Sequence, residues 1–287
     1  MKKIRVVILF LLIIALSAFN FYYRPIDGNP LITQEYMDSD AYVNGLYKSD
    51  EYFKEKLLDP ADYMMYYKAI RVSLEDEKDV TIPCGTDCEA FSDAVYAIIL
   101  DHPELISFQL ITTWRAVGDS IEYSNSSNLN KVFTYFGTRR IEREMENIRK
   151  DTKGMSDKDK ILYVYDYIAS HNYDLGFTWS ADNQSAYSFF TKGTSVCAGF
   201  AKSAQIIFQN IDIQSYLVID SDHLWNYVEY EGKYYIFDAT VGASFRDKSS
   251  HEYYEGLCIT TTGERTGFFK EFYPEVESDC LRDIFDV

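Results

Sequence analysis

The chain has 287 residues, a length that fits one or two globular domains. Hydrophobic residues make up 47% and charged residues 25%, a balance that excludes wholesale disorder. With 28 Lys and Arg residues against 45 Asp and Glu residues, the net charge is −17. This charge argues against nucleic acid or an anionic membrane surface as the main partner, because both require a basic face.

The first 24 residues predict a targeting segment. Lys2, Lys3 and Arg5 precede an apolar run from Val6 to Phe19. A charged start followed by such a run is typical of a secretory signal, and the run is short for a membrane span, which needs about 20 residues. A cleaved signal, an uncleaved anchor and a buried helix of the fold stay open as alternatives. The first two place the rest of the chain outside the cytoplasm, either secreted or anchored to the membrane.

Residues 25–150 predict a linker followed by a smaller α+β region. Residues 25–50 are polar and turn-rich, and helical patterns follow over about 50–75 and up to about Asp101. The expected strands are Ile106–Trp114, Ser120–Ser124 and Lys131–Gly137, and residues 138–151 predict a charged helix.

A boundary near 150–155 separates this region from a second domain, residues 151–287. Gly154 breaks the charged helix, and Ser156 opens another. Apolar residues recur on one face of this next helix, at Ile161, Tyr165, Ile168 and Ala169.

Cys197 lies where a loop becomes a helix. Gly193 and Thr194 precede it, and apolar residues recur at helical spacing after it, at Ala201, Ala204, Ile207 and Phe208. At a helix start the dipole and the free backbone N–H groups favour a thiolate, the nucleophilic form of cysteine. The same N–H groups can stabilise an oxyanion. The structural alternative is a small buried cysteine that fills a gap between helix and sheet.

A β-hairpin is predicted downstream of this cysteine. Glu231-Gly232 is a tight-turn signal between two alternating runs. The first run begins at Ser221, and the return strand is expected over Lys233–Thr240. A turn centred on residues 231 and 232 places Trp225 opposite Asp238.

This register makes His223 and Asp238 diagonal neighbours on one face of the hairpin, with backbones roughly 7–8 Å apart. A carboxylate at that position can orient the imidazole and stabilise its charged form. Taken singly, each residue also fits a structural role, His223 as a strand histidine and Asp238 as a strand-end carboxylate. The ordered set of Cys197, His223 and Asp238 is more specific than its parts.

Three motifs resemble the bacterial transglutaminase-like cysteine protease superfamily. They are Cys-Ala-Gly-Phe-Ala from Cys197, His-Leu-Trp-Asn-x-Val from His223, and Gly-Lys-Tyr-Tyr-x-x-Asp-x-Thr from Gly232. Upstream, the His-Asn-Tyr-Asp segment from His171 and the Ser-Ala-Tyr segment from Ser185 are similar to the same domain. The resemblance covers about residues 155–245. Leu224 and Val241 depart from the usual Ala and Trp of the family.

The resemblance implies a papain-like α+β core in which a helix-borne cysteine packs on an antiparallel sheet. It implies acyl transfer through a thioester on a protein or peptide substrate, with cell-wall peptide as one option, and with neither cofactor nor metal. Cys197 matches the nucleophile, His223 the general base and acid, and Asp238 the orienting carboxylate of a Cys-His-Asp triad. Two other functions stay open: a catalytically silent binding or scaffold protein at the cell surface, and a papain-like cell-wall endopeptidase of another lineage.

The second donor of an oxyanion hole is left open among Trp179, Gln184 and Tyr187. The acceptor of the acyl group, water in a peptidase or an amine in a transglutaminase, is also left open. Trp225 and Asn226 are expected to support the site by packing and hydrogen bonding.

The chain contains five cysteines, so at least one thiol cannot pair within it. In an oxidising compartment, pairing Cys84 with Cys88 and Cys258 with Cys280 leaves Cys197 free. Other pairings of these four are possible, and so is a zinc site that uses Cys84, Cys88 and His102.

Overall fold

The computed structural model describes residues 52–57, 65–66, 69–70, 80–83, 89–103, 113–118, 120–124, 131–176, 183–245, 247–260, 267 and 269–287. The chain divides into two units, Met1–Ser39 and Asp40–Val287, and all described residues belong to the second. The predicted targeting segment, Cys84 and Cys88 lie outside the described residues. Within the described ranges, none of the helices has the length and apolar character needed to cross a membrane.

A small sheet and two helices come first. They are α3 (Tyr52–Leu57), β1 (Val80–Pro83), α5 (Glu89–Asp101), β2 (Thr113–Val117) and β3 (Ser120–Ser124). The strands form an antiparallel sheet in the order β1-β3-β2. The predicted strand over 120–124 and the predicted helix ending at Asp101 are confirmed. Most of the predicted strand over 106–114 lies outside the described residues.

Helix α6 (Lys131–Asp151) corrects one prediction, because the segment expected to be a strand, Lys131–Gly137, is helical. The helix is continuous with the predicted charged helix, whose residues Ile141, Met145 and Ile148 are buried at helical spacing. Gly137 does not end the helix. It makes room for the ring of Tyr187, whose Cε2 would lie 1.8 Å from a Cβ at this position. Packing therefore overrides the strand preference of the aromatic and β-branched residues before Gly137.

Helix α7 (Asp157–Ala169) agrees with its prediction. The Ser156 side chain caps it by accepting the Asp159 N–H at 3.2 Å. The predicted apolar face is buried, at Ile161, Tyr165, Ile168 and Ala169, with Val164 added. This face contacts α9 and α10.

The remaining elements build a helix-on-sheet unit. They are β4 (Asn172–Tyr173), α8 (Ala186–Lys192), β5 (Thr194–Ser195), α9 (Cys197–Asn210), β6 (Ser215–Ile219), β7 (Leu224–Tyr230), β8 (Lys233–Phe237), α10 (Ala239–Phe245), the 3₁₀ helices η2 (His251–Leu257) and η3 (Lys270–Phe272), and α11 (Leu281–Phe285). Strands β4 and β5 pair in parallel, and β6, β7 and β8 form an antiparallel sheet in that order.

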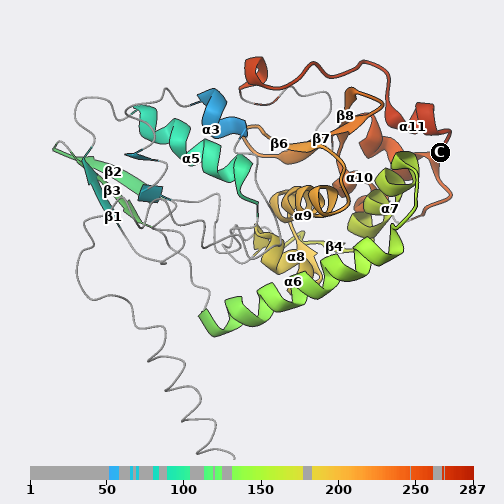
Figure 1. Cartoon of the computed structure of the whole chain (residues 1–287), viewed down its shortest axis with the longest axis horizontal. Helices are drawn as coiled ribbons and strands as arrows, with labels where there is room; N and C mark the ends of the chain where they lie inside the picture. Colours follow the sequence, from blue (N-terminus) through green and yellow to red (C-terminus); the bar gives the residue numbers. More distant parts are fainter. Residues whose placement is uncertain are drawn as a thin grey trace, which may run out of the picture. The chain divides into compact units, whose positions relative to one another are not determined.

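Helix α9 lies against β6 and β7 on one side and contacts α7 and α8 on others (Figure 1). Its apolar side chains join the core formed with β7 and β8, at Phe200, Ala204, Ile207, Phe208, Val228 and Phe237. The expected fold class is confirmed: the protein is α+β, with the Cys197 helix packed on an antiparallel sheet.

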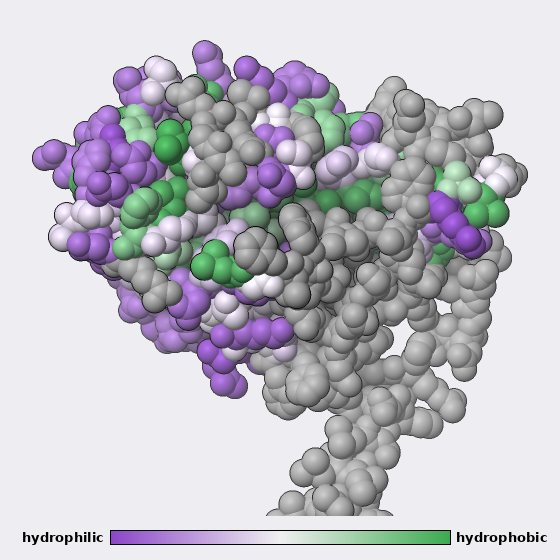
Figure 2. All heavy atoms as spheres, turned by 180° about the vertical axis from the view of Figure 1, so that it is seen from behind, coloured by the Kyte–Doolittle hydropathy of each residue, from purple (hydrophilic) through white to green (hydrophobic). Residues whose placement is uncertain are grey.

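One face of the described part of the chain is mainly hydrophilic (Figure 2). Figure 2 shows broad hydrophilic areas on one face, with apolar residues in small separate groups. The exposed apolar side chains in the described part of this unit include Leu175, Phe245 and Ile284. This surface agrees with the acidic composition of the chain.

Candidate active site

Cys197 is the first residue of α9, as the sequence predicts. Its side chain is 8% exposed, and it is the free cysteine of the described residues. The N-cap residue, Val196, offers no side-chain cap, so backbone N–H groups of the first turn have no capping partner from it. The thiol therefore sits where the helix dipole is positive.

Two neighbouring segments hold this helix start in place. The Val196 N–H donates to the Asn183 carbonyl at 3.0 Å, and the Asp174 N–H donates to the Ser195 carbonyl at 2.8 Å. Gly199 permits the close approach, because a Cβ there would lie 1.9 Å from Ser195 Oγ. The backbone around Cys197 is thus fixed on both sides.

The hairpin has the predicted register. Glu231 and Gly232 both have positive φ, 53° and 79°, as a two-residue hairpin turn of type I′ requires. Asn226 pairs with Phe237 and Tyr230 with Lys233, which is the pairing that the turn predicts.

The return strand is shorter than predicted, because β8 ends at Phe237 and not at Thr240. The Asp238 carboxylate accepts the Thr240 N–H at 3.1 Å and also the Thr240 hydroxyl. These bonds start helix α10, since a carboxylate that accepts an N–H two residues later acts as a helix cap. Asp238 therefore lies at a corner between strand and helix.

His223 and Asp238 meet as predicted. His223 Nε2 and Asp238 Oδ2 are 2.8 Å apart, and both side chains are buried. The Trp225 ring stacks on His223 with centroids 5.7 Å apart. The Asp238 N–H donates to the Gly256 carbonyl at 2.7 Å, and this bond fixes the backbone of Asp238.

The electrostatics of His223 favour its charged form. Burial lowers the pKa of His223, but hydrogen bonds and charges from Asp238 and Cys197 outweigh it and raise this pKa to about 10. Because Asp238 engages Nε2, the other ring nitrogen, Nδ1, is the one available to Cys197. The structure thus pairs His223 with Asp238, and Cys197 is close enough to act on the pKa of His223.

A buried polar bridge ties the cysteine helix to the sheet. Asn226 Nδ2 donates to the Ala201 carbonyl at 3.1 Å and to Gln205 Oε1 at 3.2 Å. Gln205 Nε2 in turn donates to the Ser215 carbonyl at 2.6 Å. The expected supporting role of Asn226 is thus a set of specific hydrogen bonds between α9, β6 and β7.

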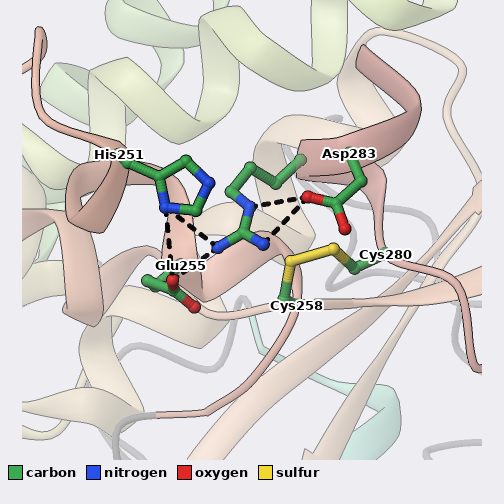
Figure 3. The surroundings of a disulfide bond; sticks show 6 residues. His251, Glu255, Cys258, Cys280 and Asp283 are labelled. Atoms are coloured by element: carbon green, nitrogen blue, oxygen red, sulfur yellow. Dashed lines mark hydrogen bonds and ion pairs between the residues drawn. A yellow bond between two sulfur atoms is a disulfide. The ribbon is translucent and has the colours of Figure 1, made fainter. Parts of the chain in front are cut away.

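A disulfide and ion pairs flank η2, the 3₁₀ helix whose Gly256 carbonyl accepts the Asp238 N–H. Cys258 and Cys280 are bonded, as one of the predicted pairings has it. The Arg282 guanidinium pairs with Glu255, and its Nε donates to Asp283 Oδ1 at 2.9 Å. Figure 3 shows Glu255 and Asp283 near this disulfide. These contacts join the C-terminal segment to η2, which carries Gly256.

This cluster also contains a group of three potential metal-ligand residues among those that the structure describes. The ligand atoms of Cys258, Cys280 and Asp283 lie within 4.8 Å of one another. The disulfide engages both sulfurs, so neither is available as a thiolate ligand.

The three predicted oxyanion donors have different outcomes. Trp179 lies outside the described residues. Gln184 is 1% exposed, and its amide nitrogen and oxygen have no hydrogen-bond partner among the described residues. The Tyr187 ring packs against Gly137 of α6, which gives it a structural position.

Sequence reasoning missed Tyr173 as a neighbour of the cysteine. Burial raises the pKa of Tyr173, and the Cys197 side chain raises it further, whereas the Cys197 backbone N–H lowers it by hydrogen bonding. The residue was visible in the His-Asn-Tyr-Asp segment, but strands β4 and β5 have two residues each. Strands this short leave no periodic pattern in a sequence.

No protein-family model matches this chain, and no curated protein matches it. Two solved structures are similar to it. A structure of a TGase has a TM-score of 0.33 and 15% identity over 56% of this chain and 51% of that chain. A structure described as a "Putative Cysteine Protease" from Cytophaga hutchinsonii has a TM-score of 0.30 and 15% identity over 46% of this chain and 62% of that chain. The matches thus span between about half and three fifths of those chains.

Proposed function

We propose that the protein is a cysteine acyl-transfer enzyme of the transglutaminase-like kind, with Cys197, His223 and Asp238 as its catalytic triad. One observation carries the proposal: a free cysteine at a helix start acts on the pKa of a histidine that is held by a buried carboxylate at 2.8 Å. That arrangement has the three roles that nucleophilic catalysis requires, a nucleophile, a base and a group that orients the base.

The reaction proceeds in two halves. His223 takes the thiol proton, and Cys197 Sγ attacks the carbonyl carbon of a peptide bond or of a glutamine side chain. The carbon–nitrogen bond then breaks, and the leaving amine or ammonia takes the proton from His223. Water or a primary amine attacks the thioester, which releases an acid or a new amide and restores the thiol.

The charge of His223 suits these two reaction steps. A pKa of about 10 keeps the imidazole protonated once it has received the thiol proton. The imidazolium is then both the counter-ion of the thiolate and the acid for the leaving amine. Asp238 stabilises this charged ring and fixes its orientation.

The substrate class proposed is a protein or peptide amide. The predicted targeting segment, residues 1–24, motivates a place outside the cytoplasm, secreted or anchored to the membrane. Cell-wall peptide is one substrate in such a place.

The test is the reactivity of Cys197. Intact protein is treated with iodoacetamide at pH 6, and the site of alkylation is read by peptide mass spectrometry. We expect Cys197 to react much faster than a model thiol, and Cys197→Ala to remove this signal. The variant His223→Gln is expected to slow the labelling, because the counter-ion of the thiolate is lost. Labelling of wild-type Cys197 at the rate of a model thiol would overturn the proposal in favour of the binding or scaffold function.

A second measurement separates water from an amine as the acceptor. A glutamine-containing peptide is incubated with the protein in the presence of a fluorescent primary amine. Incorporation of the amine into the peptide indicates a transglutaminase, whereas cleavage of the peptide or release of ammonia alone indicates hydrolysis. Cys197→Ala is the control for both products.

A further inference from the structure

Tyr173 is placed at the cysteine by backbone pairing. It is the second residue of β4 and pairs with Ser195 of β5, two positions before Cys197. Its ring packs against Phe200 in the first turn of α9, with centroids 5.7 Å apart. These two contacts fix the ring at the N-terminal end of the cysteine helix.

The Tyr173 phenol lies within electrostatic reach of Cys197, because both the thiol and the backbone N–H of Cys197 act on it. Burial and the neighbouring thiol raise the pKa of Tyr173, so the phenol keeps its proton at neutral pH. A phenol can accept one hydrogen bond and donate another at the same time.

The chemistry of the proposed reaction needs a donor at this position. When Cys197 attacks an amide, the carbonyl oxygen becomes an oxyanion, and the backbone N–H of Cys197 supplies one hydrogen bond to it. A second donor must lie about 2.7–3.1 Å from the place that this oxyanion occupies. Strand pairing with Ser195 and the Phe200 ring hold Tyr173 at the start of α9, where its phenol is within electrostatic reach of both the N–H and the sulfur that define this place.

We propose that Tyr173 is the second member of the oxyanion hole, donating its hydroxyl proton in a hydrogen bond to the oxyanion formed on Cys197. The substrate oxygen then lies between the Cys197 N–H and the Tyr173 hydroxyl and accepts a hydrogen bond from each. Tyr173 stays protonated throughout, so the step moves no electrons or protons beyond those of the proposed reaction. The inference rests on the proposed function.

Gln184 is the competing donor. Its amide is buried and has no hydrogen-bond partner among the described residues. The next residue, Ser185, has its carbonyl oxygen 2.8 Å from where a Cβ on Gly199 would lie, so Gln184 also flanks the start of α9. We favour Tyr173 because strand pairing and the Phe200 ring hold it at the start of α9, where the thiol and backbone of Cys197 act on its phenol.

The experiment compares two reactions of the same thiol. Alkylation of Cys197 by iodoacetamide forms no oxyanion, whereas acylation by a p-nitrophenyl ester does. For Tyr173→Phe we expect acylation to fall about 10²–10³-fold, the usual effect of removing one oxyanion donor, with alkylation unchanged. Unchanged alkylation also reports that the variant is folded around an intact thiol.

Two variants serve as controls. Tyr163→Phe removes a tyrosine hydroxyl on α7 that bonds Asp151 at 3.0 Å, away from the cysteine helix start, and is expected to change neither reaction. Gln184→Met keeps the size of the side chain and is expected to leave acylation unchanged. Loss of acylation in Gln184→Met but not in Tyr173→Phe would overturn the inference.

Three other outcomes would also decide between the inference on Tyr173 and the alternatives. An equal fall of both reactions in Tyr173→Phe would overturn the inference, because it indicates that the tyrosine positions the thiol and does not bind the oxyanion. If wild-type Cys197 reacts rapidly and Tyr173→Phe is acylated at the same rate, this inference fails while the proposed function stands. If wild-type Cys197 reacts with neither reagent faster than a model thiol, both fail.

Discussion

The two sides of the candidate triad are held by different chemistry. On the cysteine side, Asn226 and Gln205 join α9 to β6 and β7 through buried hydrogen bonds. On the carboxylate side, Asp238 is supported by η2, which the Cys258–Cys280 disulfide ties to the C-terminal segment (Figure 3).

The difference has a physical reason. The cysteine helix packs on the sheet over a long face, so side-chain amides in the interface can fix its position. The carboxylate lies at the corner between β8 and α10, where the supporting element is one short 3₁₀ helix. An element this short gains from a covalent tie, because a disulfide restricts the unfolded chain.

The largest expected effect on the acylation rate comes from Asp238→Asn. This substitution changes the His223–Asp238 contact, which joins the two sides of the candidate triad. The amide can still cap α10 through its oxygen, but its nitrogen can face His223 Nε2 as a donor, which favours the wrong tautomer. Acylation by a p-nitrophenyl ester should fall at least about 10²-fold. Asp247→Asn, at an exposed position, is the control and should keep the wild-type rate; an equally slow control would contradict the interpretation.

The charge of His223 sharpens the comparison through pH. The pKa of His223 is raised from its ordinary value of 6.5 to about 10. The folded protein therefore binds a proton at His223 more tightly than the unfolded chain does, and protonation stabilises the fold. This stabilisation is fully present below about pH 6.5 and is lost as the pH rises toward 10.

The measurement is the free energy of unfolding of wild type and His223→Gln across this range. The advantage of the wild type should shrink as the pH increases from 6 to 10. An advantage that stays constant or grows with pH would contradict the raised pKa.

Removing the covalent tie tests the carboxylate side alone. The double substitution Cys258→Ser and Cys280→Ser removes a bridge that spans a sequence separation of 22. The free energy of unfolding should decrease by about 3 kcal/mol, from the entropy of a loop of this length. Denaturant unfolding of the oxidised wild type and the double variant measures the difference, and equal stabilities would show that the tie contributes nothing.

Removing an amide tests the cysteine side. Asn226→Leu leaves the Ala201 carbonyl without its side-chain donor and should cost about 1–3 kcal/mol of unfolding free energy. The matched control is Ser203→Ala on the same helix, because the Ser203 hydroxyl is buried and has no hydrogen-bond partner among the described residues. The control should be neutral or stabilising in the same denaturant experiment. A larger loss in Ser203→Ala than in Asn226→Leu would refute the role given to the polar bridge.

The sequence predicts the parts of the site that depend on local signals. Glu231-Gly232 specifies a two-residue turn, and the turn sets the register that brings His223 near Asp238. The helix start at Cys197 follows from the loop residues before it and the apolar spacing after it.

Long-range packing was beyond those signals. In the sequence, Gly137 is typical of the end of a strand. In the structure it lies inside a helix, where the absence of a Cβ leaves room for the Tyr187 ring. The end of β8 was misjudged because the Asp238 side chain caps α10 and also binds His223. Tyr173 was missed because a two-residue parallel pairing brings it to Cys197.

The hairpin turn has a consequence for how such a chain can change in evolution. Successive residues of a strand point to opposite faces of the sheet, so one residue inserted at 231–232 would shift β8 against β7 and turn its side chains over. His223 and Asp238 would then no longer share a face, although the insertion lies in an exposed loop. Loop length here should therefore be inherited as strictly as the site residues themselves, and relatives that vary it should have lost the His–Asp contact.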